Sequence, residues 1–217
     1  MRPASWTGSW RWIPRWCGPT NTPPGRATTT TRGAALSYTT RQAQSRHSQA
    51  LGRSRGGWST KVHLAVDGNL RPLSLHLTGG QAGDSPQFTA ILDNICVARP
   101  GPGRPRRRPE KVLADKAYSS RANRAYLRRR GIRQVIPEPD DQLANRRRRG
   151  YRGGRPPAFD GVAYRDRNVV ERGINRFKHW RGLATRYDKT ARNYLGGLHL
   201  ASILMWADDL TQPGDRP

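Results

Sequence analysis

The chain of 217 residues has little cysteine, no long apolar run and no acidic residue among its first 66 positions. Cys17 and Cys96 are its only cysteines. They are too few for a disulfide framework or a zinc site, so we expect a reducing, cytoplasmic compartment. No apolar run of membrane-spanning length and no basic-then-apolar N-terminal signal is present, so we expect a soluble protein without a membrane partner.

Positive charge dominates what is present. Lysine and arginine number 40 against 15 acidic residues, which gives a net charge of +25 and a pI near 11.6. Nucleic acid is the commonest polyanion that offsets such a charge, and an anionic membrane is the rival. GC-rich coding would also inflate arginine, and the 23 glycines and 17 prolines agree with it. The length suits one modest domain with a single core.

The acids divide the chain into two parts, because all 15 lie from Asp67 onward. Residues 1–50 combine a tryptophan cluster with runs of proline and threonine and show no sustained period. We therefore predict neither strand nor helix there and interpret the segment as disordered. Base stacking by the tryptophans is the alternative, but it needs a scaffold to present the rings. We place the ordered domain at 51–210 and a tail at 211–217.

The first half of the ordered part predicts a hairpin and then a helix. "STKVHLAV" and "LRPLSLHLT" read as strands around the turn Asp67-Gly68-Asn69, where a turn is a better interpretation of Asp67 than a catalytic acid. Asp84 or Ser85 should cap the next helix, with Pro86 in its first turn. Its buried side chains should be Phe88, Ile91, Leu92 and Ile95.

The second half alternates strands and helices. "KVLADKAY" predicts a buried strand, a helix capped by Ser119 or Ser120 should end at Gly131, and "IRQVIPE" predicts another strand. A basic insertion spans 138–163, and two helices follow at 164–182 and 189–209. The order predicts an α/β fold, an α+β mixed sheet with helices on its faces. The last helix should supply core residues Tyr194, Leu195, Leu198, Leu200, Ile203, Leu204 and Trp206.

Two carboxylates are candidates for chemistry. Asp115 ends an apolar strand, where active sites of open sheets gather, although an aspartate there also caps turns. On an ideal helix, Glu171 shares an arc of about 40° with Tyr164, Arg167 and Lys178. That face is either a solvated surface or a metal-binding acid flanked by phosphate-binding cations. Divalent metals take hard oxygen ligands, and a pair of them can activate an attacking oxygen and stabilise a leaving one.

The spacing Tyr164-x2-Arg167-x3-Glu171-x6-Lys178 resembles the signature of DDE transposases of bacterial insertion sequences. The segments "GRSRGGWSTKVHLAVDG", "HLTGGQAGDSPQF", "VLADKAYSS" and "WRGLATRYDKTARNYLGGLHLASILMW" are similar to one branch of that family. The resemblance covers 51–208. It implies a ribonuclease-H-like catalytic domain that cleaves and transfers DNA strands with two Mg²⁺ or Mn²⁺ ions. It also implies a homo-oligomer on DNA, at the bacterial nucleoid in the cytoplasm.

The same resemblance assigns roles to residues. Asp115 and Glu171 would be the second and third catalytic acids and the metal ligands. Tyr164, Arg167 and Lys178 would position the terminal DNA. The basic loops at 104–108 and 146–149 would hold backbone phosphates, the latter through Arg146, Arg147 and Arg148.

The chain departs from the family at the first catalytic aspartate, because nothing upstream of "GRSRGG" is acidic. The genetic code suggests why. Tryptophan is encoded only by TGG and isoleucine codons begin with AT, so a shifted frame across Trp12-Ile13 necessarily reads GAT, an aspartate codon. In that frame the codons for 10–25 can spell A-V-D-P-T-V-V-R-A-H-Q-H-A-A-G, which resembles the family's first-aspartate strand. We therefore expect residues 1–50 to be out of frame, either in a decayed copy or beside a programmed frameshift.

Three functions are consistent with the charge, the motifs and the missing acid. The first is a transposase catalytic domain that is inactive alone because one metal acid is missing. The second is a non-catalytic DNA-binding remnant or inhibitor that competes with intact transposase for element ends. The third is a basic RNA-binding protein, against which the carboxylate pattern and the apolar C-terminal helix argue.

Overall fold

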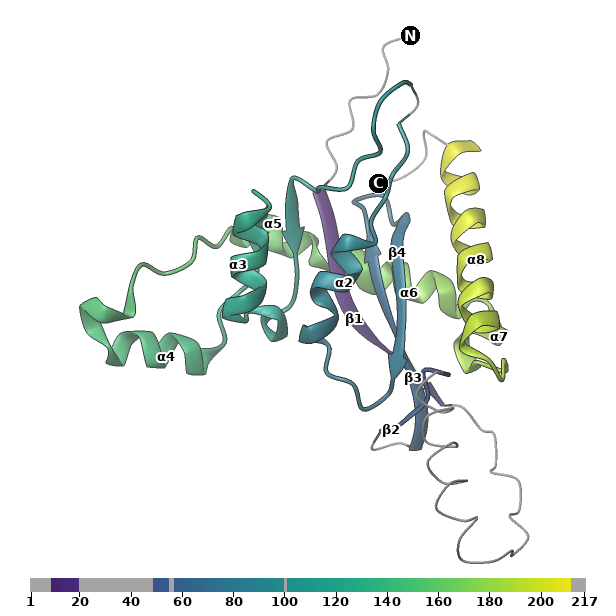
Figure 1. The fold of residues 1–217 in the computed structure, drawn as a ribbon, viewed down its shortest axis with the longest axis horizontal. Coiled ribbons are helices and arrows are strands. Elements are labelled where there is room, and N and C mark those ends of the chain that lie inside the picture. Colours follow the sequence, from purple (N-terminus) through teal and green to yellow (C-terminus); the bar gives the residue numbers. More distant parts are fainter. Residues whose placement is uncertain (1–8, 20–48, 55–56, 100, 212–217) are drawn as a thin grey trace, which may run out of the picture.

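A single mixed sheet organises the protein (Figure 1). The computed structural model describes residues 9–19, 49–54, 57–99 and 101–211. Neighbouring strands run in the order β2-β3-β1-β5-β6, and β4 also pairs with β3. β1 is antiparallel to β3 and parallel to β5, and β6 is parallel to β5. The strands are β1 (Ser9–Pro19), β2 (Gly52–Ser54), β3 (Gly57–Val66), β4 (Pro72–Gly79), β5 (Lys111–Leu113) and β6 (Arg133–Val135).

The predicted hairpin is confirmed as β3 and β4, whose register pairs Leu64 with Leu75. Asp67 makes the turn, as expected. Its Oδ1 accepts hydrogen bonds from the backbone N–H groups of Asn69 and Arg71, each at 2.9 Å. An aspartate that bonds its own backbone two residues on is a strong turn former, which explains why this position could be interpreted from sequence.

The prediction of no strand within 1–50 is wrong at Ser9–Pro19, where β1 lies between β3 and β5. Its pairing is long-range and its register shifts between Pro14 and Cys17. Proline has no N–H to donate and a bulge interrupts alternation, so the strand leaves no period to detect. Residues 1–8 and 20–48 lie outside the described residues, so their expected disorder and out-of-frame origin stay predictions.

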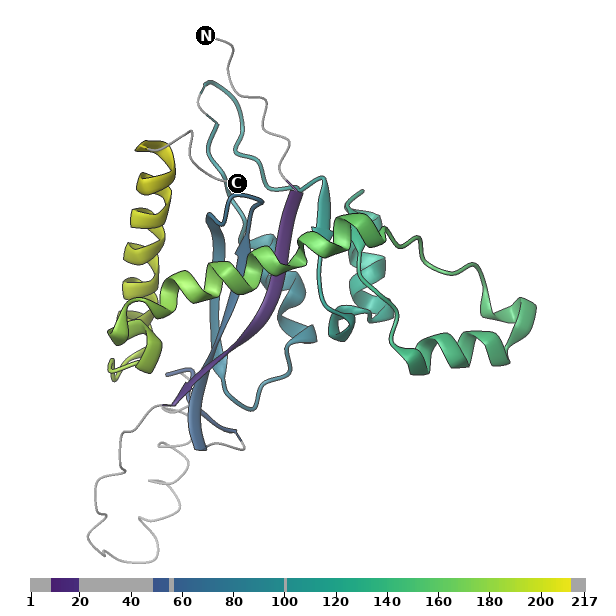
Figure 2. The same cartoon turned by 180° about the vertical axis from the view of Figure 1, so that it is seen from behind.

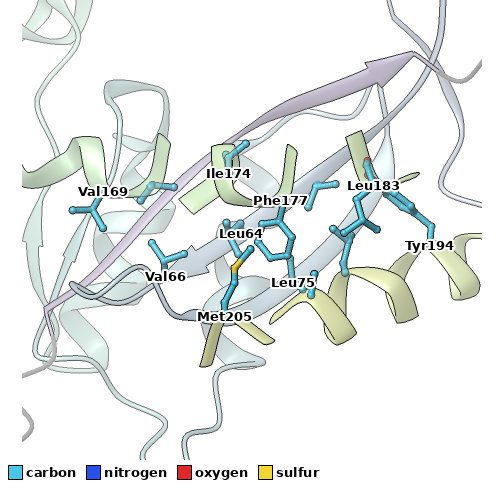
Figure 3. Close-up of a cluster of buried hydrophobic side chains, with 13 residues drawn as sticks. Leu64, Val66, Leu75, Val169, Ile174, Phe177, Leu183, Tyr194 and Met205 are labelled. Atoms are coloured by element: carbon cyan, nitrogen blue, oxygen red, sulfur yellow. The ribbon is translucent and has the colours of Figure 1, made fainter. Parts of the chain in front are cut away.

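Alternate residues of β3 face the two layers of helix. Ala65 packs with Phe88 and Leu127 from α2 (Phe88–Asp93) and α3 (Arg121–Arg129). Leu64 and Val66 pack against α6 (Val169–Lys178) and α8 (Ala191–Thr211) in the cluster that Figure 3 shows. The sheet therefore has helices on both faces, as the α/β prediction required. The four side chains predicted to be buried in the first helix are all buried: Phe88, Ile91, Leu92 and Ile95.

Helix caps were predicted with mixed success. Ser120 caps α3 through its side chain, which accepts from the N–H of Asn123, and Gly131 follows with a positive φ of 63°. Asp84 does not cap with its side chain, which was expected of Asp84 or Ser85. Its carboxylate instead contacts Lys61 Nζ at 2.9 Å, because a charged partner on β3 competes for it. The helical segment there begins as a 3₁₀ turn (η1, Ser85–Gln87) before α2.

The single helix predicted for 164–182 is wrong. The chain forms α5 (Gly161–Arg165), the 3₁₀ turn η4 (Asp166–Asn168), α6 and a short α7 (Arg181–Thr185). Asp160 starts the run early, because its carboxylate accepts from the N–H groups of Val162 and Ala163. Figure 2 shows this helical run crossing the sheet over β1.

The predicted core of α8 is partly wrong. Tyr194 and Leu198 are buried, but Leu200, Ile203 and Leu204 are exposed, and the helix instead buries Ala201, Ser202 and Met205. Trp206 is half-buried and donates from Nε1 to the carbonyl of Pro72 at 2.8 Å, which ties α8 to β4. The helix carries apolar residues on several faces, so periodicity could not choose the buried one.

Candidate active site

Asp115 leaves the C-terminal end of β5, as the sequence predicted. Its Oδ1 accepts from the backbone N–H of Lys116 at 2.6 Å and so caps the 3₁₀ turn η2 (Lys116–Tyr118). The side chain remains 40% exposed. The capping interpretation is therefore correct, and it leaves the carboxylate facing outward with capacity to bind a further partner.

Glu171 lies in the first turn of α6 and is exposed. The partial positive charge at a helix N-terminus favours a carboxylate at this position. Val169, Val170 and Ile174 of the same helix are buried in the core. Gly173 keeps α6 close to the sheet, since a Cβ there would lie 3.2 Å from Val66 Cγ1. The buried face of the helix thus directs Glu171 to the opposite side.

Arg167 joins the two acids. Its Nη1 lies 3.9 Å from Asp115 Oδ1, and its Nη2 lies 3.6 Å from Glu171 Oε1. The structure therefore brings Asp115 and Glu171, 56 positions apart in the chain (171 minus 115), to one guanidinium group. The sequence placed Arg167 among the DNA contacts and gave no sign that it bridges the acids. Its spacing of four from Glu171 is the one signal that could have suggested an ion pair.

Tyr164 completes this group. The Arg167 guanidinium lies 5.5 Å from the centre of its ring, and Phe159 packs on the same ring at 5.3 Å. Burial raises the pKa of Tyr164, the Arg167 charge opposes this, and the Asp115 charge adds to it. The phenol therefore stays protonated at neutral pH and can donate a hydrogen bond.

The donor set suits hydrated divalent metal. No cluster of three or more histidine, cysteine, aspartate or glutamate side chains with metal-binding geometry occurs among the described residues. The carboxylates of Asp115 and Glu171 nevertheless both lie near one cationic group, the guanidinium of Arg167. Mg²⁺ commonly binds one or two carboxylates and completes its shell with water and substrate phosphate.

The remaining predicted DNA contacts lie apart from this group. Lys178 is seven residues beyond Glu171, roughly 10 Å along the helix axis, and its Nζ contacts Asn175 Oδ1 at 3.2 Å. Arg146 is engaged by both carboxylate oxygens of Glu138. Arg147 and Arg148 are exposed at the end of α4 (Asp140–Arg148), which projects away from the sheet (Figures 1 and 2).

A cavity of about 490 Å³ beside β6 was not predicted. Lys111, Arg128 and Arg133 make its lining basic. Lys111 begins β5 whereas Asp115 follows its end, so the cavity does not coincide with the carboxylates. Its lining comes from separate segments, including Phe159 and Asp160 before α5. Short-range sequence patterns cannot reveal such an assembly.

A mixed sheet that presents two carboxylates from a strand end and a helix is an arrangement suited to metal-assisted chemistry. The family described as the transposase DDE domain matches residues 26–206, and the chain belongs to that family. No helix in the described part of the chain is both long and apolar enough to cross a bilayer.

Two relatives agree with this assignment. A Brucella ovis protein named "Putative transposase for insertion sequence element IS6501" is 28% identical over 150 residues, covering 68% of this chain and 98% of that protein. A Burkholderia cepacia protein with the same name for element IS402 is 33% identical over 153 residues, covering 70% of this chain and 64% of that protein. No solved structure matches the chain.

Proposed function

We propose that this chain carries the catalytic domain of an insertion-sequence transposase, in which Asp115 and Glu171 hold Mg²⁺ or Mn²⁺ for DNA strand cleavage and transfer. One observation carries the proposal: both acids lie against a single guanidinium at the end of β5. The mixed sheet with helices on both faces supports the ribonuclease-H-like fold that the resemblance implies.

Each residue has a role in this proposal. Bound divalent ions would supply Lewis-acid chemistry at the scissile phosphate and the attacking oxygen. Asp115 and Glu171 hold the cation. Tyr164 donates a hydrogen bond from its phenol O–H to a phosphate oxygen of the terminal DNA, and Arg167 and Lys178 offset the backbone charge. Arg147 and Arg148 are exposed, and in this proposal they contact backbone phosphates further along the duplex without reading its sequence.

The pairing of β1 suggests a position for the missing first acid. β1 pairs in parallel with β5 so that Arg11 is level with Leu113. Ile13 pairs with Leu64 of β3. If the β1–β5 register continued two residues past the end of β5, Ile13 would be level with Asp115. The shifted-frame aspartate codon spans Trp12-Ile13, so an aspartate encoded there would lie near Asp115 in that register. This supports the inference that residues 1–50 are out of frame and that the chain is inactive alone.

The decisive experiment compares this chain with a frame-corrected chain in which codons 10–50 are read in the alternative frame. We expect Mn²⁺-dependent cleavage of DNA carrying the element ends only by the corrected chain. Glu171→Gln in the corrected background should abolish it, while Arg172→Gln, which changes the charge of the next residue, should retain it. Cleavage by the uncorrected chain would contradict the inferred inactivity. An inactive corrected chain that folds and binds DNA would contradict the catalytic assignment.

A second candidate function is non-catalytic DNA binding that inhibits transposition. The net charge of +25 and the exposed arginines of α4 favour it. It predicts binding to element ends that weakens steeply with salt and survives Glu171→Ala. Increasing amounts of the chain should also reduce cleavage by the frame-corrected protein on a limiting amount of DNA. Binding without preference for element ends would leave this function unsupported.

A further inference from the structure

We propose that Arg167 is a built-in competitor for the metal: its guanidinium holds Asp115 and Glu171 together without a divalent ion and must move aside for one to bind. The inference rests on the proposed function of those two acids. It goes beyond that function because it gives Arg167 an action before any DNA is bound.

The geometry supports one bridge through Arg167 between the two acids better than it supports two independent ion pairs on the surface. Nη1 faces Asp115 at 3.9 Å and Nη2 faces Glu171 at 3.6 Å, so two nitrogens of one planar group serve two acids. The Tyr164 ring lies 5.5 Å from the guanidinium and restricts it from a second side. Arg167 is also only 29% exposed, although the acids on either side of it are more accessible.

Competition follows from electrostatics. A divalent ion held by both carboxylates would compete with Arg167 for the same two acids and would repel the guanidinium charge. Binding of either cation therefore weakens binding of the other, and this coupling is reciprocal. A DNA phosphate offers Arg167 a bidentate alternative partner. Phosphate that draws Arg167 away from the acids would thus raise their affinity for metal.

The arrangement would order the steps of the reaction. Without DNA the arginine offsets part of the charge of the two acids and lowers the affinity of the site for free divalent ions. With DNA in place the arginine contacts phosphate and the acids become available to the metal. A nuclease controlled in this way assembles its metal site more readily on its substrate than away from it.

The test measures binding of Mn²⁺ alone to the full chain without DNA, by electron paramagnetic resonance of the free ion. Arg167→Gln should tighten Mn²⁺ binding about fivefold to tenfold, since exposed ion pairs of this kind are individually weak and two are lost. The matched control is Arg172→Gln, which removes the same charge from the residue after Glu171 on α6 and should change affinity less than about twofold. Circular dichroism should confirm that both variants keep their fold.

Two further variants make the result specific. Arg167→Lys keeps the charge but cannot span two carboxylates with one planar group, so it should tighten binding more than Arg172→Gln does. Adding Glu171→Gln to Arg167→Gln should remove the gain. Equal effects of Arg167→Gln and Arg172→Gln, or no Mn²⁺ binding by Arg167→Gln, would overturn the proposal. The frame-corrected cleavage assay tests the proposed function separately, so the two failures remain distinguishable.

Discussion

Two arginines of this protein each lie between two carboxylates, and their surroundings differ. Arg71 contacts Asp67 at 2.6 Å and Asp209 at 3.2 Å, and all three side chains are nearly buried, with exposures of 10%, 2% and 13%. Arg167 contacts Asp115 and Glu171 at 3.9 and 3.6 Å, with exposures of 29%, 40% and 54%. The first group joins the β3–β4 turn to α8, whereas the second lies at an open edge of the fold.

These surroundings distinguish an ion-pair group that stabilises the fold from one that can exchange partners. Asp67 also accepts two backbone hydrogen bonds, and Arg71 stacks on Trp206 at 4.7 Å, so the buried group is fixed from several sides. A buried charge that loses its partner is costly, which makes such a group essential to the fold. The exposed group has long contacts and solvent nearby. It can therefore exchange partners at low cost, which the proposed binding of metal and phosphate would require.

The largest expected effect comes from breaking the buried group. Asp67→Ala should lower the free energy of unfolding by about 3–5 kcal/mol, because it leaves a buried arginine undercompensated and removes the turn's hydrogen bonds. Urea denaturation followed by tryptophan fluorescence measures it. The matched control is Asp115→Ala, which removes an exposed acid. An equal decrease in the free energy of unfolding in both variants would show that the two arginine groups contribute equally to stability.

The distinction between buried and exposed polar groups extends to pH. Burial lowers the pKa of His63 to about 4; Asp84 opposes this, and His76 and Lys61 reinforce it. The unfolded chain binds the proton near pH 6.5, so it binds more protons than the native state as the pH falls below that value. The contribution of neutral His63 to the free energy of unfolding is therefore complete above pH 6.5. It is lost as the pH falls toward 4, and the loss is about 2 kcal/mol at pH 5.

Unfolding titrations in urea at several pH values between 7 and 5 measure this slope. His63→Asn should flatten the slope, although it also alters the contact with Thr78, in which the two side chains lie 2.7 Å apart. The exposed His199, changed to Asn, should leave the slope unaltered. An unchanged slope in His63→Asn would mean that another group governs the acid response.

Sequence could predict the features that depend on local chemistry. The Asp67 turn and the Ser120 cap are hydrogen bonds between residues close in the chain, so residue type and order are sufficient. Asp115 and Glu171 were selected as candidates because each carries a position-specific signal, a strand end for the first and a helical spacing for the second. Their common partner could not be derived, because it depends on how α6 crosses the sheet.

The missed features depend on long-range packing. β1 is recognisable only through its partners β3 and β5, since Pro14 and the shifted register remove the alternation of a strand. The buried face of α8 depends on which apolar side meets β4 and α7, and Leu200 and Met205 are equally apolar candidates until that contact is known. The predicted helix is interrupted at Asp166–Asn168, where the chain forms a 3₁₀ turn. A spacing argument treats the whole segment as one ideal α-helix and cannot detect this turn.

The weakest change in stability is expected when Arg167, the second of the two arginines, is replaced. Arg167→Gln should change the free energy of unfolding by less than about 1 kcal/mol, because exposed ion pairs at such distances contribute little. Arg71→Gln should cost several times more, since it leaves Asp67 buried beside an amide. The two substitutions are chemically identical, so urea midpoints at one pH give the comparison directly. A large loss for Arg167→Gln would show that the bridge holds α6 against the sheet, and the site's acids would then be structural rather than available to a metal.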